Sequence, residues 1–214
     1  MTRVEQLLSI SSNSLAPSPL SSWNTLDHYP LGPELRRMLE LKNGFYAFES
    51  ALHVFPLTRD PAAGLNLEEW NSDSLWRSDY GDLTTGLLFF AEDVFQDQFC
   101  LSANGVLRFD AETGGSKPLA GSLEQWADGL LRDRNRETGW TFAHKWQLEN
   151  GTLPHGKRLM PKTPFFLGGA YTLDNLWAGD AVEGIRFKAD LAMQTRSVPD
   201  GAEVRLIIGK KPAN

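Results

Sequence analysis

Three carboxylates lie within six positions of one another in the middle of the chain, at Glu92, Asp93 and Asp97. Paired carboxylates can act as general acid and general base, and glycoside hydrolases place two of them beside the bond that they break. The segment that holds them, residues 91–97, separates two apolar runs, so we expect a loop between two strands. Acidic loop residues are most often simply solvated, and no further catalytic signature accompanies these three. The sequence therefore favours a non-catalytic role for them.

Residues 151–158, GTLPHGKR, match the spacing of a phosphate-binding P-loop, in which backbone amides and a lysine cradle phosphates. Arg158, however, stands where such a loop has a magnesium-binding Ser or Thr. No hydrophobic strand precedes the segment, and Pro161 and Pro164 prevent the long helix whose N-terminus would bind phosphate. We interpret the match as coincidental.

The other residues that often carry chemistry form no site by their spacing. Four histidines are scattered without the spacing of metal ligands, and the zinc-protease, hydrolase-elbow and dinucleotide motifs are absent. The single cysteine, Cys100, lies in an apolar segment, and one cysteine excludes an internal disulfide framework and a cysteine-rich zinc site. We therefore predict that the protein is not an enzyme and has neither a metal nor a cofactor.

The net charge of the chain limits the kinds of partner that we expect. A net charge of −6 argues against a protein that binds nucleic acid directly or that binds anionic membranes. No apolar run approaches the roughly 18 residues of a membrane span, and the N-terminus lacks the apolar segment of a signal peptide. We expect a cytoplasmic protein.

Acidic side chains are concentrated between residues 68 and 97, where eight acids accompany a single base, Arg77. Two explanations stay open, a solvated helix face followed by a loop, and a surface that contacts a basic partner. The 7 Trp and 12 Phe residues are expected mainly in the core, although some could anchor a partner. The candidate partner-binding residues are Glu69, Asp73, Asp79, Asp82, Glu92, Asp93 and Asp97.

The acidic loop belongs to what we expect to be the centre of the fold. Residues 87–90, 99–101 and 106–109 are apolar and β-prone. Asn104 and Gly105 separate the last two runs, and both residues tolerate the positive φ of a type I′ hairpin turn. The sequence therefore predicts three neighbouring antiparallel strands.

Helical periodicity and capping signals predict elements on both sides of these strands. The clearest is an apolar stripe over residues 123–131, preceded by a capping box at Ser122 and Gln125. Pro56 limits the pairing of a strand at residues 52–57, which we expect at an edge. Further helices are expected at 4–10, 31–43, 67–76, 140–149 and 180–196, and further strands at 164–170 and 203–208.

These elements give an α+β fold, with a central, mainly antiparallel sheet flanked by helices. Composition divides the chain into three parts. Residues 1–24 are rich in Ser and Pro and are expected to be an N-terminal arm. Residues 25–138 form the main domain, and residues 139–214 form an α/β extension packed on the same core.

Three stretches resemble the SUKH superfamily, the cell-wall-regulator-like proteins of which many are immunity proteins in bacterial toxin systems. LGPELRRML at 31–39, followed by KNG, resembles the Pro-capped helix of that family, and ALHVFPL at 51–57 resembles its next strand. The segments at 86–110, with the helix at 123–131, resemble its central strands and closing helix. The resemblance covers residues 25–135. One departure is the loop at 91–97, which lacks the glycines that are common in the family.

The resemblance implies a non-catalytic protein that binds and neutralises a cognate toxin. An acidic inhibitor would associate rapidly with a basic toxin, and many such toxins attack nucleic acid. Two alternatives remain: a general interaction or scaffold module of the same family with a regulatory role, and an unrecognised enzyme that uses Glu92, Asp93 or Asp97.

Overall fold

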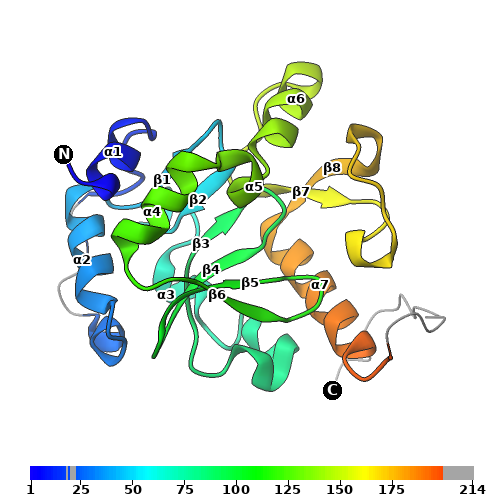
Figure 1. The fold of residues 1–214 in the computed structure, drawn as a ribbon, viewed down its shortest axis with the longest axis horizontal. Coiled ribbons are helices and arrows are strands. Elements are labelled where there is room, and N and C mark those ends of the chain that lie inside the picture. Colours follow the sequence, from blue (N-terminus) through cyan, green and yellow to red (C-terminus); the bar gives the residue numbers. More distant parts are fainter. Residues whose placement is uncertain (18, 20–22, 200–214) are drawn as a thin grey trace.

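The computed structural model describes residues 1–17, 19 and 23–199. In this part of the chain, six strands form one antiparallel sheet in which each strand pairs with the next along the chain (Figure 1). Helices flank this sheet, which confirms the predicted α+β fold. The strands are β1 Phe45–Ala47, β2 Leu52–Val54, β3 Leu88–Asp93, β4 Gln98–Ser102, β5 Gly105–Phe109 and β6 Ser116–Ala120.

Helices surround the sheet, and a second, two-stranded antiparallel sheet, β7 Lys157–Pro161 and β8 Leu176–Asp180, follows it. None of the helices within the described ranges has the length and apolar composition needed to cross a membrane. The α-helices are α1 Arg3–Ser9, α2 Gly32–Leu41, α3 Leu67–Trp70, α4 Leu123–Arg132, α5 Arg134–Thr138, α6 Trp140–Asn150 and α7 Ala181–Thr195, and the 3-10 helices include η3 Arg77–Thr84 and η4 Phe165–Leu167.

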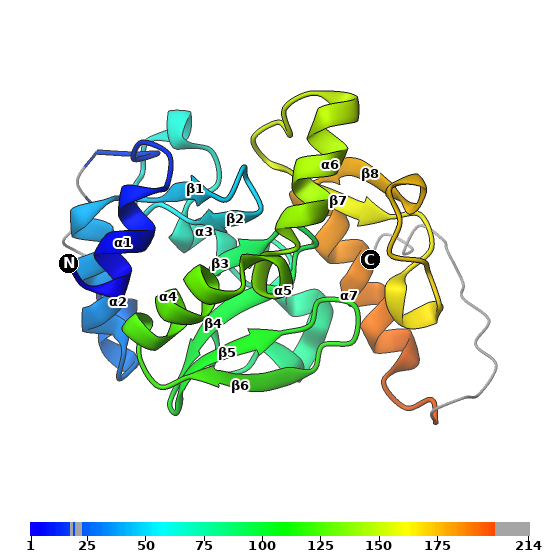
Figure 2. The same cartoon turned by 45° about the horizontal axis from the view of Figure 1, so that its top comes forward.

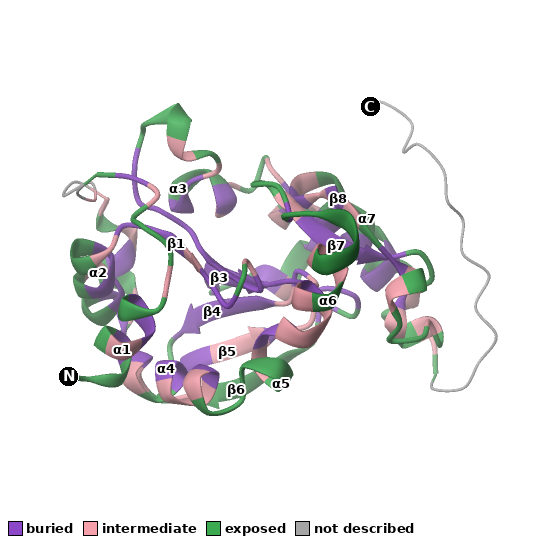
Figure 3. Cartoon of the chain, turned by 90° about the horizontal axis from the view of Figure 1, so that it is seen from above, coloured by how far each residue is buried: buried purple, intermediate pink, exposed green. Residues whose placement is uncertain are grey.

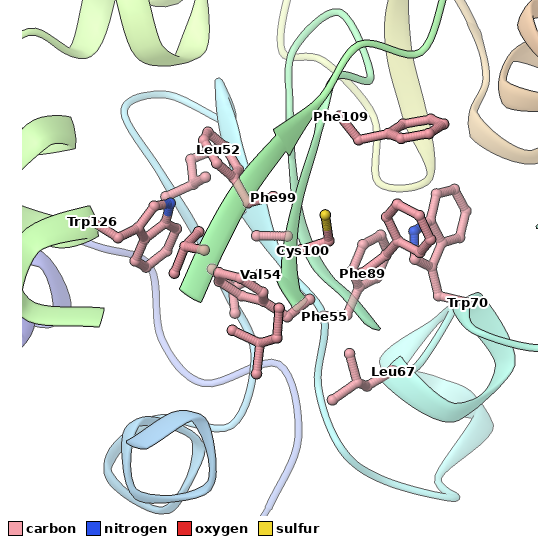
Figure 4. Close-up of a cluster of buried hydrophobic side chains, with 14 of the residues drawn as sticks. Leu52, Val54, Phe55, Leu67, Trp70, Phe89, Phe99, Cys100, Phe109 and Trp126 are labelled. Carbon is pink, nitrogen blue, oxygen red and sulfur yellow. The ribbon is translucent and has the colours of Figure 1, made fainter. Parts of the chain in front are cut away.

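The six-stranded sheet is packed on both faces, and buried residues are concentrated in it and on the inner sides of the helices (Figure 3). Trp126 of α4 covers one face, where its ring meets Phe99 edge to face at 5.6 Å. On the opposite face, Trp70 of α3 stacks on Phe55 at 4.6 Å. Figure 4 shows these two groups of side chains on either side of the strands. Every one of these rings is almost fully buried, so the aromatic residues mainly form the core.

A β-bulge interrupts β3 between Phe89 and Ala91, at the position of Phe90. The ring of Phe90 contacts α4, whereas the ring of Phe89 contacts the aromatic cluster on the opposite face. Beyond the bulge the side chains alternate again, because successive residues of a strand point to opposite faces. Glu92 and Asp93, adjacent in sequence, therefore point to different sides of the sheet.

Both edges of this sheet are protected. Residues 12–16 run along β1, where the amide of Ser12 donates to the carbonyl of Tyr46 at 2.7 Å. The other edge strand, β6, is mostly exposed and contains Lys117 and Pro118. A proline cannot donate a hydrogen bond to another strand, and an edge lysine also opposes pairing.

Segments on both sides of this sheet in the sequence pack on it. In α1, Val4, Leu7 and Leu8 belong to the same hydrophobic core as the sheet. The first ten residues, expected to be part of a separate arm, are therefore packed against the main domain. On the C-terminal side, the amide of Leu159 in β7 donates to the carbonyl of Val94 at 2.9 Å. As Figure 2 shows, α4, α5 and α6 follow one another from the sheet toward β7 and β8.

Several predicted elements need correction. β2 is not an edge strand, because it lies between β1 and β3. Residues 164–170 contain the 3-10 helix η4 instead of a strand, and the expected helix at 67–76 ends at Trp70. The strand expected at residues 203–208 lies outside the described residues.

The hairpin between β4 and β5 forms as predicted, but with a different turn. The turn residues are Ala103 and Asn104, and Gly105 is the first residue of β5. Gly105 has a φ of 120°, whereas Asn104 is not among the positive-φ residues of the described chain. A type I′ turn needs positive φ at both central residues, so the Asn-Gly pair marks the hairpin without forming that turn.

Candidate functional site

A cavity of about 410 Å³ opens where the ends of β3 and β5 meet the α5–α6 junction and the segment that follows β7. We call it the acidic pocket. Four carboxylates line it, and only two of them, Asp93 and Asp97, are among the predicted partner-binding residues. These carboxylates are Asp93, Asp97, Asp110 and Glu112.

Asp93 shapes the floor of the acidic pocket. Its Oδ1 accepts hydrogen bonds from the amides of Phe95 at 2.8 Å and Asp97 at 3.0 Å. Gln96, between them, adopts a left-handed φ of 69°, which completes the tight turn. The turn places the Phe95 ring in the wall of the pocket and brings Asp97 beside Asp93.

Gly139 allows α5 and α6 to close over this turn. Its φ of 68° is left-handed, and a Cβ atom at this position would lie 2.6 Å from the Phe95 ring. A residue with a side chain would therefore meet both backbone strain and a steric clash. Gly139 separates α5 from α6, and residues of both helices line the pocket.

Arg108 joins two of the carboxylates. Its guanidinium bonds to Asp93 and, at 3.1 Å, to Asp97, and it also donates to the carbonyl of Glu137 at 2.9 Å. Burial raises the pKa of Asp93; Arg108 opposes this rise and the neighbouring Asp97 adds to it. One arginine therefore balances two adjoining acids, and its donors are committed to them.

Asp110 and Glu112 form no ion pair with any residue of the described chain. Asp110 accepts hydrogen bonds from the amides of Glu112 and Thr113 at 2.9 and 3.0 Å. Burial raises the pKa of Asp110, and the neighbouring Asp97 raises it further. Burial also raises the pKa of Glu112, while the Phe166 amide and the charge of Lys188 oppose this rise and the nearby acids add to it. The pocket is thus lined by four carboxylates and two arginines, Arg108 and Arg136, so its acids outnumber its cations.

Aromatic rings form the remaining walls. Phe165 and Tyr171 stack with their centroids 3.9 Å apart and their planes 4° from parallel. Phe95 meets Phe165 edge to face at 5.2 Å and Phe142 at 5.6 Å. Tyr171 is 61% exposed and stands at the rim. Tyr171 lines the same cavity as the four acids. Partial burial raises its pKa, and the charge of Glu112 raises it next.

A second cluster, the buried network of Glu92, His53 and Arg158, lies on the opposite side of β3. Glu92 accepts from Arg158 Nε at 2.7 Å and lies 3.3 Å from His53 Nδ1. All three side chains are almost fully buried. Burial would raise the pKa of Glu92, but Arg158 and His53 lower it to about 2. Arg158, the residue that broke the apparent P-loop, therefore joins β7 to the main sheet.

The structure does not gather the predicted partner-binding residues into one surface. Glu92 and Asp93 are 2% and 1% exposed and belong to β3, so the prediction that they lie in an exposed loop is wrong. The physical reason is that each meets an arginine from a distant part of the chain. Of the predicted residues, only Asp93 and Asp97 line the acidic pocket.

The other predicted acids have local or pairwise roles. Glu69 caps the start of α3 by accepting from the amide of Asn66 at 3.3 Å, which completes a capping box with the Asn66 side chain. Asp79 and Asp82 pair with arginines of the C-terminal region. Asp73 lies 3.7 Å from Arg77 and is strongly exposed.

Sequence reasoning missed Asp110, Glu112 and the ring of Tyr171. Asp110 and Glu112 follow the end of β5 at Phe109, and neither was among the predicted site residues. Their spacing, two acids one residue apart at the end of a strand, is the one sequence signal for them. The contact of Phe166 with Glu112 joins residues 54 positions apart and has no such signal. As for metals, the described residues contain no group of three or more His, Cys, Asp or Glu side chains able to hold an ion.

Comparison with known proteins gives the fold alone. No model of a known protein family matches the chain, and no curated protein matches it. Among solved structures, the crystal structure of Atu4351 from Agrobacterium tumefaciens is similar, with a TM-score of 0.52 and 11% sequence identity. The similarity covers 86% of this chain and 87% of that one, so it extends over most of both chains.

Proposed function

We propose that this protein is a non-catalytic binding protein, and specifically an immunity protein that neutralises a cognate bacterial toxin. The observation that carries the proposal is the acidic pocket, in which Asp110 and Glu112 form no ion pair with any described residue and aromatic rings form the walls. Buried or half-buried carboxylates without a cation are unfavourable in the free protein, and they become favourable when a basic partner approaches. The resemblance of residues 25–135 to the SUKH superfamily supports the same function.

Overall charge supports a basic partner. A net charge of −6 would steer a basic toxin toward the protein and speed association, and nucleases are one class of such toxins. The exposed acids Asp73 and Asp82 would contribute to this steering field without contacting the partner directly. We assign direct contact to the acidic pocket and not to Glu92, which is enclosed by its own partners.

An enzyme that uses Asp93 and Asp97 is the alternative with a specific observation in its favour, because both carboxylates line one cavity. The hydrogen bonds of these residues argue against it. Arg108 and backbone amides occupy Asp93 at both oxygens, and Asp97 likewise receives the Ala111 amide and Arg108. A carboxylate needs a free oxygen to take a proton from a substrate or to attack one. Asp93 and Asp97 therefore serve to position the pocket.

Co-expression with the protein encoded by the neighbouring gene tests the proposed function. We expect a stable complex and protection of the host cell from toxicity, with slower association as the salt concentration rises. Absence of both the complex and protection would overturn the proposal. Several unrelated host partners in a pull-down, with no dedicated toxin, would favour the scaffold alternative instead.

A further inference from the structure

Glu112 is built like a binding residue. Glu112 is only 6% exposed, and it lines the acidic pocket. One oxygen, Oε2, accepts from the amide of Phe166 at 2.9 Å. Within the described chain, the other oxygen, Oε1, receives no hydrogen bond and no cation, although it is not sealed from the solvent of the cavity. A largely buried carboxylate thus offers one free acceptor to whatever enters.

The cations around the acidic pocket have other partners. Arg136, which also lines the pocket, is largely exposed and lies 3.7 Å from Glu137. Arg108 binds Asp93 and Asp97. Lys188 is 2% exposed and is not among the lining residues; its ammonium donates to the carbonyl of Phe95 and acts on Glu112 through its charge without forming an ion pair with it. Glu112 and Asp110 therefore present negative charge to the cavity that no described side chain neutralises by contact. A ligand that completes this site has to be cationic.

The shape of the site adds a second requirement. The stacked pair of Phe165 and Tyr171 and the edge-on ring of Phe95 give the pocket flat apolar walls beside its acids. A guanidinium group is planar, stacks on aromatic faces and donates two parallel hydrogen bonds to carboxylates. An ammonium group is a compact, strongly hydrated charge and uses the flat walls less well. The combination of walls and acids thus favours a guanidinium.

We propose that the acidic pocket binds the guanidinium group of an arginine side chain, which donates to Glu112 Oε1 and Asp110 while it packs against Phe165 and Tyr171. The arginine belongs to a partner protein, and this part of the proposal rests on the proposed function. Binding of the guanidinium itself follows from the pocket and does not depend on which protein supplies it.

The test uses the full chain and three small probes: N-acetylarginine methylamide, its lysine counterpart and its uncharged citrulline counterpart. Amide NMR spectra of the ¹⁵N-labelled protein report binding. We expect the arginine probe to bind in the millimolar range and to shift the amides of residues 93–97, 110–112 and 165–171. The lysine probe should bind several-fold more weakly, and the citrulline probe should not bind. Equal binding of the arginine and citrulline probes, or shifts elsewhere only, would overturn the proposal.

Glu112→Gln removes the charge while its amide oxygen can still accept from Phe166. We expect at least a tenfold loss of affinity for the arginine probe. Glu40→Gln, on the exposed side of α2, is the matched control and should bind as the wild type does. Unchanged binding by Glu112→Gln, with its spectrum still that of a folded protein, would also overturn the proposal.

The two proposals fail separately. If the complex with the neighbouring gene product forms but Glu112→Gln leaves its affinity unchanged while the control behaves as wild type, the arginine source is wrong and the proposed function stands. If no complex forms but the arginine probe binds, the proposed function fails and a free guanidinium compound is the ligand of the pocket.

Discussion

Glu92 and Asp93 are neighbours in sequence, and they belong to two clusters that differ in one respect. Each is a buried carboxylate of β3 that meets an arginine from another part of the chain. In the buried network, Glu92 has Arg158 and His53 around it and its pKa falls to about 2. In the acidic pocket, the acids outnumber the cations that touch them, and the pKa of Asp93 is raised. A cluster whose carboxylates are matched by cations stabilises the fold, whereas a cluster with an excess of carboxylates can bind an additional cation.

The largest expected effect comes from breaking the balanced cluster. Arg158→Met leaves Glu92 charged, buried and without its arginine, which should lower the free energy of unfolding by about 3–5 kcal/mol. Chemical denaturation measures this loss. The double variant Glu92→Gln with Arg158→Met removes both charges and should recover most of the stability. An equally unstable double variant would show that shape, and not charge balance, is what Arg158 provides.

The pH dependence of the same network gives the next effect. Burial lowers the pKa of His53 to about 4 from its ordinary 6.5. The folded protein therefore binds this proton only at a lower pH than the unfolded chain does. Stability from this residue is present above pH 6.5 and is lost as the pH falls toward 4, by at most about 3 kcal/mol. His53→Gln should flatten the stability–pH curve over this interval. An identical slope in wild type and variant would contradict the assignment.

Gly139→Ala tests whether the α5–α6 junction shapes the acidic pocket. The left-handed φ and the approach of the Phe95 ring should together lower the free energy of unfolding by about 2 kcal/mol. Gly151→Ala is a matched control, because Gly151 also has a positive φ but has open space around it. The difference between the two variants isolates the contact with Phe95. Equal losses would show that backbone strain alone matters at Gly139.

The smallest expected effect is on the stability of the protein when Glu112 of the acidic pocket is replaced. Because the pKa of Glu112 is raised in the folded protein, its stabilising contribution is present at low pH and is lost as the pH rises. Glu112→Gln should therefore be as stable as the wild type at pH 7 or more stable, by less than about 1 kcal/mol. This advantage should disappear near pH 4. A clear loss of stability at pH 7 would place Glu112 with the structural residues.

The sequence predicts the sheet better than the site. Alternating and continuous apolar runs at 87–109 identify β3, β4 and β5 because strand periodicity is a local property. The apolar stripe and the cap at Ser122 identify α4 for the same reason. β7 and β8 were not predicted, because their sequences, KRLMP and LWAGD, show no clear alternation of apolar and polar residues. The long bulge-containing β3 extends through Glu92 and Asp93, which a local pattern reads as the start of a loop.

The site depends on contacts that no local pattern contains. Glu92 is buried because Arg158 lies opposite it, 66 positions later in the chain. Arg108 performs the same role for Asp93 from the next strand but one. A carboxylate in a strand is unfavourable alone and acceptable with its partner, so its position is decided by tertiary pairing. Sequence reasoning could name the carboxylates but not the side of the sheet that each would face.

The protected edges of the sheet decide how a partner can be recognised. A segment of the chain itself already pairs with β1, and Pro118 interrupts the hydrogen-bonding row of β6. Extended peptides are commonly captured by adding a strand to an open edge, where affinity comes from backbone bonds that are largely indifferent to sequence. With that route closed on this sheet, recognition of the partner that we propose would depend on side chains at the ends of its strands. A cognate partner and a near relative that differs at one inserted residue would then be told apart by that residue.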